Sequence, residues 1–262
     1  MQEIFKNIIT PVKSFWKSIP SKSFKKREAI FFDIDGTIFR SSLVIEHYKY
    51  LTSHPDFKIE QSKIVEDVHK RWLNRETDYE EYLFVLIQQY TEILKKLDEK
   101  TIKKTAKEVV ELKKGEIYTY IRDIITTAKK EGKLVFFISG SPDYLVSEFA
   151  KSFDVKSFGS NYIFNNEKFT GNVVPLWNSE SKKRKILELT KKYNITLSRS
   201  YAYGDTTGDF AMLEMVGKPI LVNPTKKLID LIKEKNSNHT ILIERKNVIY
   251  ELDSKNLSIN IY

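Results

Sequence analysis

The chain has 262 residues, 41% of them hydrophobic, and a formal net charge of +9. This length suits one large domain or a domain with an insertion, and the apolar content is ample for a buried core. The absence of cysteine excludes disulfide bonds, thiol catalysis and cysteine-ligated zinc sites. No apolar run is long enough to span a bilayer, and the N-terminus lacks the features of a secretory signal. We therefore expect a cytoplasmic protein.

The excess of basic residues favours anionic partners, namely phosphorylated metabolites, lipid head groups or nucleic acid. Lysine-rich codon usage in an AT-rich genome would produce the same excess without any such partner. No nucleic-acid-binding motif accompanies the charge, so we expect no nucleic-acid partner.

Residues 1–25 form a basic amphipathic segment. Apolar residues recur at helical spacing from Ile4 to Ile19, lysines lie between them, and Pro11 interrupts the pattern. Such a segment could lie on an anionic membrane surface, which would make the protein peripheral to that membrane. The alternatives are a helix that docks on its own domain and a partly disordered arm.

Two kinds of pattern follow. Residues 29–34 form an apolar run that ends in turn residues, which predicts a buried strand. Residues 41–114 show helical periodicity with almost no glycine and predict an all-helical block. Aromatic residues of this block form either its own core or the lining of a lid over a substrate: Trp72, Tyr79, Tyr82 and Phe84.

After Gly115 the pattern alternates between helix and strand. Ser141 is expected to be the N-cap of a helix with Pro142 at its first position, and Pro224 is expected to open a later helix. The predicted elements are helix 118–130, strand 133–140, helix 141–153, strands 155–164 and 167–174, helix 181–194, strand 199–205, helix 209–216, strand 218–224, the helix after Pro224 and strand 239–244.

Alternating strands and helices indicate parallel β-α-β units, whose ligand site lies at the carboxyl ends of the strands. Several polar residues directly follow predicted strands and should therefore converge on one edge of the sheet. They are Asp33, Asp35, Ser139, Gly140, Asp205 and Asp209.

This set of residues predicts a metal-dependent chemistry. Carboxylates in one pocket raise each other's pKa, and a divalent cation offsets their charge. Oxygen ligands without histidine or cysteine suit a hard ion such as Mg²⁺. Asp33 and Asp35 lie two apart on an extended strand end and point the same way, so one could attack phosphorus while the other moves protons. Gly36 would let the backbone turn sharply beside them.

Phosphoryl transfer also needs donors for the phosphate oxygens. Ser139 and the backbone N–H groups of Gly140 and Ser141 lie at the expected start of a helix, which is a favourable anion site. The sequence "SKKRK", residues 181–185, offers a lysine to complete the phosphate site.

Four motifs occur in the order "DIDGT", "ISGS", the lysine cluster and "GDTTGD". This ordered set resembles the haloacid dehalogenase (HAD) superfamily, and within it subfamily IB, the phosphoserine-phosphatase-like branch, over about residues 28–235. The resemblance implies an α/β fold: a HAD-like Rossmannoid three-layer core with a parallel sheet and an inserted, all-helical C1-type cap. The implied domains are a catalytic core of residues 26–40 and 115–262 and a cap of residues 41–114.

The resemblance also implies catalytic and metal-binding roles. Asp33 would be the nucleophile and a Mg²⁺ ligand. Asp35 would be the general acid/base, with its backbone carbonyl on the metal. Asp205 would be the third protein ligand, and Asp209 would orient the metal's waters. Together these roles imply Mg²⁺-dependent hydrolysis of a small-molecule phosphomonoester through an aspartyl-phosphate.

In the same family pattern, Ser139 and Gly140 hold the phosphate, together with one lysine. Counting back without gaps from "YAYGD" favours Lys182, with Lys183 as the second choice. The chain departs from the phosphoserine phosphatases at two places. Ser42 stands nine residues after Asp33, where those enzymes carry a glutamate that contacts the substrate amine, and Gly208 stands where that branch often has asparagine. Both departures weaken a specific assignment to phosphoserine.

Other interpretations remain open. Arg71 and Arg75 could bind a substrate carboxylate or second phosphate, or belong to a solvated helix face. The basic segment 1–25 would suit an enzyme that dephosphorylates a membrane lipid such as phosphatidylglycerophosphate. A non-catalytic phosphate-binding or scaffold protein is disfavoured, because the motif aspartates are all retained.

Overall fold

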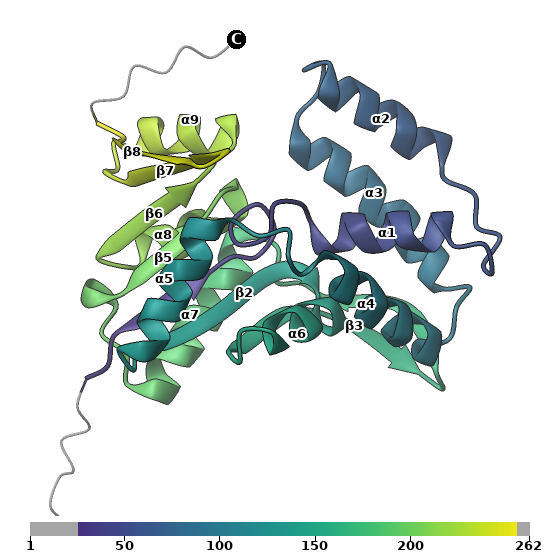
Figure 1. Cartoon of the computed structure of the whole chain (residues 1–262), viewed down its shortest axis with the longest axis horizontal. Helices are drawn as coiled ribbons and strands as arrows, with labels where there is room; N and C mark the ends of the chain where they lie inside the picture. The colour runs from purple at the N-terminus through teal and green to yellow at the C-terminus, as the bar shows by residue number, and fades with distance from the viewer. Residues whose placement is uncertain (1–25, 256–262) are drawn as a thin grey trace, which may run out of the picture.

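The computed structural model describes residues 26–255, so the predictions for residues 1–25 lie outside the described residues. Its centre is an eight-stranded sheet with the strand order β4-β3-β2-β1-β5-β6-β7-β8 (Figure 1). The strands are β1 (Ala29–Phe32), β2 (Leu134–Pro142), β3 (Lys156–Asn165), β4 (Lys168–Val174), β5 (Tyr201–Gly204), β6 (Lys218–Val222), β7 (Thr240–Arg245) and β8 (Val248–Asp253).

The six central strands, β3-β2-β1-β5-β6-β7 in sheet order, pair in parallel. β4 and β8 pair antiparallel at the two edges of the sheet. β1 lies between β2 and β5, where Phe31 pairs with Phe136 on one side and Ala202 on the other. Phe31 and Phe32 are both fully buried, because helices cover the two faces toward which neighbouring side chains point. The prediction of an α/β fold with a mostly parallel sheet is confirmed.

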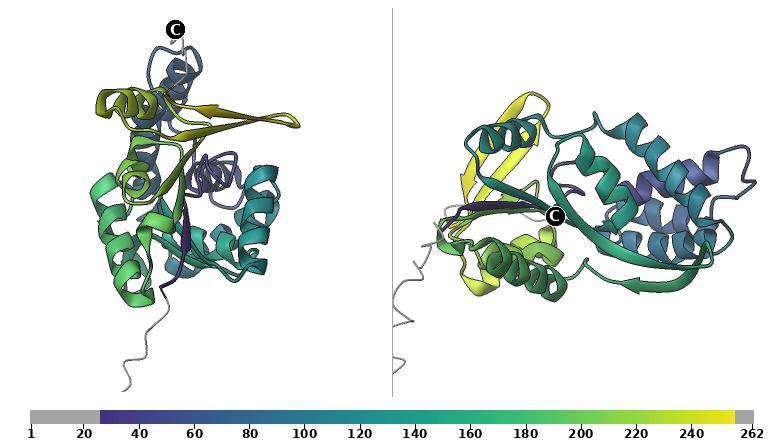
Figure 2. Two further views of the ribbon diagram at one scale, coloured as in Figure 1. Left: turned by 90° about the vertical axis from the view of Figure 1, so that its left-hand side faces the viewer. Right: turned by 90° about the horizontal axis from the view of Figure 1, so that it is seen from below.

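Helices lie on both sides of the sheet (Figure 2). An apolar cluster packs on each face. On one face Phe31 and Phe136 pack with residues of three helices, α7 (Ser179–Tyr193), α8 (Phe210–Glu214) and α9 (Lys226–Lys235). On the other face Phe32 and Phe137 pack with α5 (Thr119–Lys130) and α6 (Asp143–Lys151). Apolar residues at helical spacing on these helices produce this three-layer arrangement.

Four helices between β1 and β2 form a second body beside the sheet, which we call the cap. They are α1 (Leu43–Ser53), α2 (Lys63–Leu73), α3 (Tyr79–Leu94) and α4 (Glu99–Lys113), seen at the right of Figure 1. A buried polar chain joins this body to α6: His47 Nδ1 lies 2.7 Å from the Tyr90 hydroxyl, which lies 2.6 Å from the Tyr144 hydroxyl. Burial of these polar side chains is tolerated because each of them has a hydrogen-bond partner.

The structure corrects two local predictions and adds one strand. β2 continues through Pro142, so α6 begins at Asp143, and Ser141 makes no cap hydrogen bond. Thr225, and not Pro224, caps α9, because its side chain accepts from the Leu228 N–H. β8 was not predicted from the sequence; it pairs with β7 as the last edge. Across residues 26–255, no helix is both long and apolar enough to cross a membrane.

Candidate active site

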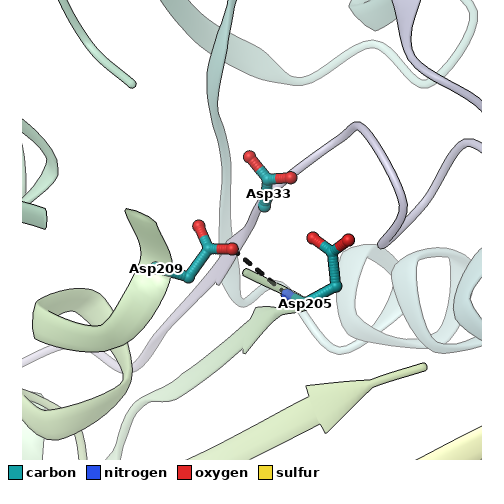
Figure 3. Close-up of side chains that lie close together, drawn as sticks. All are labelled: Asp33, Asp205 and Asp209. Atoms are coloured by element: carbon teal, nitrogen blue, oxygen red, sulfur yellow. Dashed lines mark hydrogen bonds between the residues drawn. The ribbon is translucent and has the colours of Figure 1, made fainter. Parts of the chain in front are cut away.

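Three aspartates from two segments of the chain meet at the carboxyl edge of the sheet (Figure 3). Asp33 follows β1 and Asp205 follows β5, and because these strands are parallel neighbours, both residues leave the sheet at the same level. The Asp33 N–H continues the ladder by donating to the Tyr203 carbonyl at 2.9 Å. One carboxylate oxygen from each of Asp33, Asp205 and Asp209 lies within 4.8 Å of the others.

The first turn of α7 delivers one lysine to this cluster. Lys182 Nζ lies 2.5 Å from Asp33 Oδ1 and 2.5 Å from Asp209 Oδ1, and only 3% of the residue is exposed. Asn178 fixes the start of the helix, since its Oδ1 accepts from the Ser181 N–H at 2.8 Å. Lys183, the second choice from the sequence, is exposed. The structure therefore brings Lys182 to the aspartates.

Asp209 is fully buried and organises the loop after β5. Its Oδ2 accepts from the backbone N–H groups of Asp205 at 3.1 Å and Thr206 at 3.2 Å. The loop packs tightly against Gly204, where an added Cβ would lie 2.5 Å from Asp209 Cβ. Since both Asp209 oxygens already have partners, this side chain is suited to holding the loop and the lysine in place.

Asp35 points toward β2 instead of the carboxylate cluster. Its Oδ1 accepts from the Leu43 N–H at the start of α1 at 2.6 Å. Its Oδ2 accepts from Ser139 Oγ at 3.0 Å and Ser141 Oγ at 2.6 Å. Burial raises the pKa of Asp35, and these donors only partly oppose that effect. A carboxyl group with a raised pKa is suited to donating a proton near neutral pH.

The residue after Asp35 must be glycine. Gly36 has φ of +77°, and an added Cβ there would lie 2.0 Å from Asp205 Oδ2. Thr37 stabilises the same contact, because its Oγ1 donates to Asp205 Oδ1 at 3.2 Å. The turn of "DIDGT" thus places the backbone directly against the third aspartate.

The charges of the site favour a bound cation. Burial raises the pKa of Asp33 well above its usual value; Lys182 opposes this effect and Asp209 adds to it. Burial and the charge of Asp33 likewise raise the pKa of Asp205. Burial lowers the pKa of Lys182, but Asp209 and Asp33 outweigh it, so the ammonium stays charged. One ammonium cannot balance these carboxylates, and an all-oxygen donor set of this kind fits a hard divalent ion such as Mg²⁺.

Ser139 and Gly140 lie beside the cluster at the end of β2. Ser139 is fully buried, and its Oγ also accepts from the Ser141 N–H at 3.0 Å. Gly140 is closely packed, because an added Cβ would lie 2.8 Å from Trp177 Cβ. Sequence reasoning placed the Ser141 N–H at a helix start; in the structure it faces Ser139, and the Ser141 side chain serves Asp35.

A cavity of about 900 Å³ opens from Gly36 and Asp205 to the cap. Trp72, Tyr79 and Tyr82 line it, whereas Phe84 is 63% exposed and faces away from it. The lid interpretation therefore suits those three residues and not Phe84.

The cap is fastened to the core at the mouth of this cavity. Lys227 Nζ of α9 lies 2.9 Å from Asp78 Oδ2 and 2.6 Å from Glu80 Oε2, and Thr207 Oγ1 donates to Glu80 at 3.1 Å. Sequence reasoning missed these contacts. They join residues more than a hundred positions apart, and no local pattern marks them.

Parts of the chain are similar in sequence to curated proteins. A probable phosphatase of Mycobacterium tuberculosis is 30% identical over 113 residues, which cover 43% of this chain and 39% of that protein. A Streptomyces azureus protein named for inhibition of morphological differentiation is 43% identical over 60 residues, 23% of this chain and 22% of that one. The chain thus spans less than half the length of these curated relatives.

Solved structures share the fold at low sequence identity. A Bordetella pertussis protein of unknown function is 16% identical with a TM-score of 0.62, over 81% of this chain and 97% of that one. A phosphoserine phosphatase, solved as a phospho-aspartyl intermediate analogue, is 22% identical with a TM-score of 0.58, over 85% and 95%. The model of the haloacid dehalogenase-like hydrolases matches residues 30–214, from β1 through α8. The chain therefore belongs to the haloacid dehalogenase-like hydrolases.

Proposed function

We propose that the protein is a Mg²⁺-dependent phosphatase that hydrolyses a small phosphomonoester through an aspartyl-phosphate on Asp33. The observation that carries this proposal is the buried contact of Asp33 with Lys182, inside a cluster that also holds Asp205 and Asp209. The names of two similar proteins support the class: one is a probable phosphatase, and the other was solved as an analogue of a phospho-aspartyl intermediate.

In the first step, an oxygen of Asp33 attacks phosphorus and the bond to the ester oxygen breaks. Lys182 holds Asp33 Oδ1, which leaves Oδ2 to attack. Asp35, in its protonated form, gives its proton to the departing alkoxide, so the product leaves as a neutral alcohol. The Ser139 hydroxyl, the Gly140 N–H and the Lys182 ammonium are assigned to the phosphoryl oxygens, where they offset negative charge.

In the second step, Asp35 takes a proton from water, and the resulting hydroxide attacks phosphorus. The bond between phosphorus and Asp33 breaks, which releases inorganic phosphate and restores both aspartates. Asp33, Asp205 and the backbone carbonyl of Asp35 would hold Mg²⁺, with Asp209 beside its waters. When bound, the ion would supply positive charge near the phosphoryl group.

The domain organisation proposed with this function is a catalytic core of residues 26–40 and 115–262 and a cap of residues 41–114. The substrate would bind in the cavity between the two bodies, where the cap excludes water and selects the leaving group. Small phosphate esters are the proposed partners, in the cytoplasm.

The test is a phosphatase screen of the full chain over phosphoserine, sugar phosphates, nucleotides and lysolipid phosphates, with and without Mg²⁺. We expect release of inorganic phosphate from at least one ester, dependent on Mg²⁺, and its loss in Asp33→Asn. Normal turnover by a folded Asp33→Asn variant would overturn the proposal.

A further inference from the structure

The cap side of the active-site cavity is a cluster of aromatic rings. Trp72 of α2 stacks on Tyr82 of α3 with ring centroids 5.4 Å apart and planes 9° from parallel. His69 lies 4.9 Å from Tyr82, and Tyr79 lies 5.6 Å from Trp72. All four residues line the cavity. We call these four residues the aromatic wall. Tyr82 is only 3% exposed, so His69, Trp72 and Tyr79 supply most of the ring surface that the wall offers to a ligand between cap and core.

Tyr79 connects the aromatic wall to the reaction centre. Burial, and then the charges of Asp35 and Asp205, raise its pKa well above the usual value, so the phenol stays neutral. Ser42 opposes this rise in pKa, and it also lines the cavity. Since Tyr79 and Ser42 share the cavity lining with Gly36 and Asp205, a leaving group that enters the cavity meets a neutral phenol and a serine hydroxyl as well as the other rings.

Among residues 26–255, the cavity lining leaves no carboxylate free for a cationic leaving group if Asp205 holds the metal. Apart from Asp205, its acidic lining residues are Asp78 and Glu80. Both are already paired with Lys227, at 2.9 Å and 2.6 Å. An ammonium group placed here would have to displace that lysine from its two partners, at a cost in electrostatic energy.

Among the lysines and arginines of the described residues that line the cavity, one has no carboxylate partner. Arg40 pairs with Glu244 at 2.8 Å, and Lys49 and Lys226 pair with Glu46 and Asp230 at 3.0 Å and 2.6 Å. Arg75 is different, because its partner within residues 26–255 is the Trp72 backbone carbonyl, 3.4 Å from Nη1. Its side chain lines the same cavity as the aromatic wall, and its guanidinium is available to an anion.

We infer that the substrate's leaving group has a flat aromatic body and carries a second anionic group. The aromatic body packs on the aromatic wall, and the anion meets the Arg75 guanidinium. This inference rests on the proposed phosphatase function and deepens it by naming a substrate class. A cavity of about 900 Å³ has room for such a ligand.

Two other leaving groups could use aromatic rings. A quaternary ammonium group is attracted to ring faces, and an alkyl chain packs on any apolar surface. The quaternary ammonium is disfavoured because Arg75 repels it and the nearby carboxylates are occupied. An alkyl chain is disfavoured because it carries no charge and leaves the Arg75 guanidinium without an anion. Both alternatives are therefore outcomes that the experiment distinguishes.

The experiment measures kcat/KM of the full chain with Mg²⁺ for phenyl phosphate, 4-carboxyphenyl phosphate, phosphocholine and octyl phosphate. We expect 4-carboxyphenyl phosphate to be the best of the four. Arg75→Gln should lower kcat/KM for 4-carboxyphenyl phosphate about tenfold, which is the scale of one exposed charge-assisted hydrogen bond. The variant should leave kcat/KM for phenyl phosphate unchanged. Trp72→Leu should lower kcat/KM for both aryl esters, and Trp72→Phe, which keeps a ring, should recover most of that loss. Arg71→Gln is the matched control, because Arg71 pairs with Glu81 at 3.2 Å and does not line the cavity.

Several results would overturn the inference. The first is a preference for phosphocholine or octyl phosphate. The second is an equal loss of kcat/KM for both aryl esters in Arg75→Gln. The third is an effect of Arg71→Gln equal to that of Arg75→Gln. Thermal unfolding of each variant shows whether the fold is intact, and Trp72→Phe keeps a ring in place if Trp72→Leu is unstable. Turnover without the expected preference defeats this inference alone, whereas no turnover of any ester defeats the proposed function as well.

Discussion

Lys182 Nζ lies 2.5 Å from Asp33 Oδ1, although the two residues are 149 positions apart in the chain. The lysine is 3% exposed and touches Asp209 at the same distance. Its ammonium therefore offsets the negative charge of the two carboxylates and holds Asp33 in position. Several expected results follow from this relationship and from the residues around it.

Lys182→Met should be far more damaging than Lys183→Met. Removing the buried ammonium leaves Asp33 and Asp209 uncompensated, which costs about 3–5 kcal/mol of unfolding free energy in the metal-free protein. Loss of the same charge should lower kcat by a factor on the order of 10². Lys183 is exposed, so its variant should stay within about 0.5 kcal/mol of the wild type. Urea unfolding and phosphate release measure both effects; equal behaviour of the two variants would contradict the assignment.

Gly36→Ala tests the turn after Asp35, with Gly132→Ala as a matched control. Both glycines have positive φ, +77° and +71°, so each substitution carries a strain of about 1–2 kcal/mol. Only at Gly36 does the new Cβ meet an atom, Asp205 Oδ2 at 2.0 Å, while nothing lies within 4 Å at Gly132. We expect Gly36→Ala to lose at least about 3 kcal/mol, since overpacking adds to the strain. The prediction fails if urea unfolding gives the two variants the same stability.

Mg²⁺ should stabilise the folded protein against heat. A ligand that binds only the folded state adds about 2.7 kcal/mol at a concentration one hundred times its Kd. Asp205→Asn should abolish most of the rise in Tm, because it removes one of the three clustered carboxylates. Asp56→Asn is the control, since the Asp56 side chain is 81% exposed and belongs to no such cluster. A thermal-shift titration that shows the same Mg²⁺ response in Asp205→Asn would contradict the site.

His47 should make the protein less stable in mild acid. Burial lowers its pKa to about 3 from the ordinary value of 6.5. The unfolded chain therefore binds a proton that the folded chain excludes, and stability falls as pH drops from about 6.5 toward 3. Between pH 7 and 5 the loss is about 2 kcal/mol.

His47→Gln provides the check on that pH dependence. Glutamine does not titrate, and it can replace hydrogen bonds to Tyr90 and Thr105. Urea unfolding at pH 7 and pH 5 should show a smaller loss for the variant. If the difference between the two pH values is the same in both proteins, another group causes the acid sensitivity.

Much of the fold was accessible from the sequence, because its determinants are local. Apolar runs, helical periodicity and turn residues identified most strands and helices, including the helical block between β1 and β2. β8 was missed, since its apolar run has only three residues, Val248 to Tyr250, and none of its residues is buried. The end of β2 was misjudged because Pro142 suits a helix start, whereas pairing of Pro142 with Ser160 extends the strand.

The sequence by itself determined which strand ends carry Asp33, Asp35, Asp205 and Asp209, since parallel strands bring their carboxyl ends to one edge. Only the tertiary structure decided between Lys182 and Lys183, because neighbouring helix residues point about 100° apart and packing on the sheet sets the rotation. It also decided that Ser139 and Ser141 both bond Asp35, and that Lys227 fastens the cap. Such contacts join distant segments, and their geometry depends on how whole elements pack.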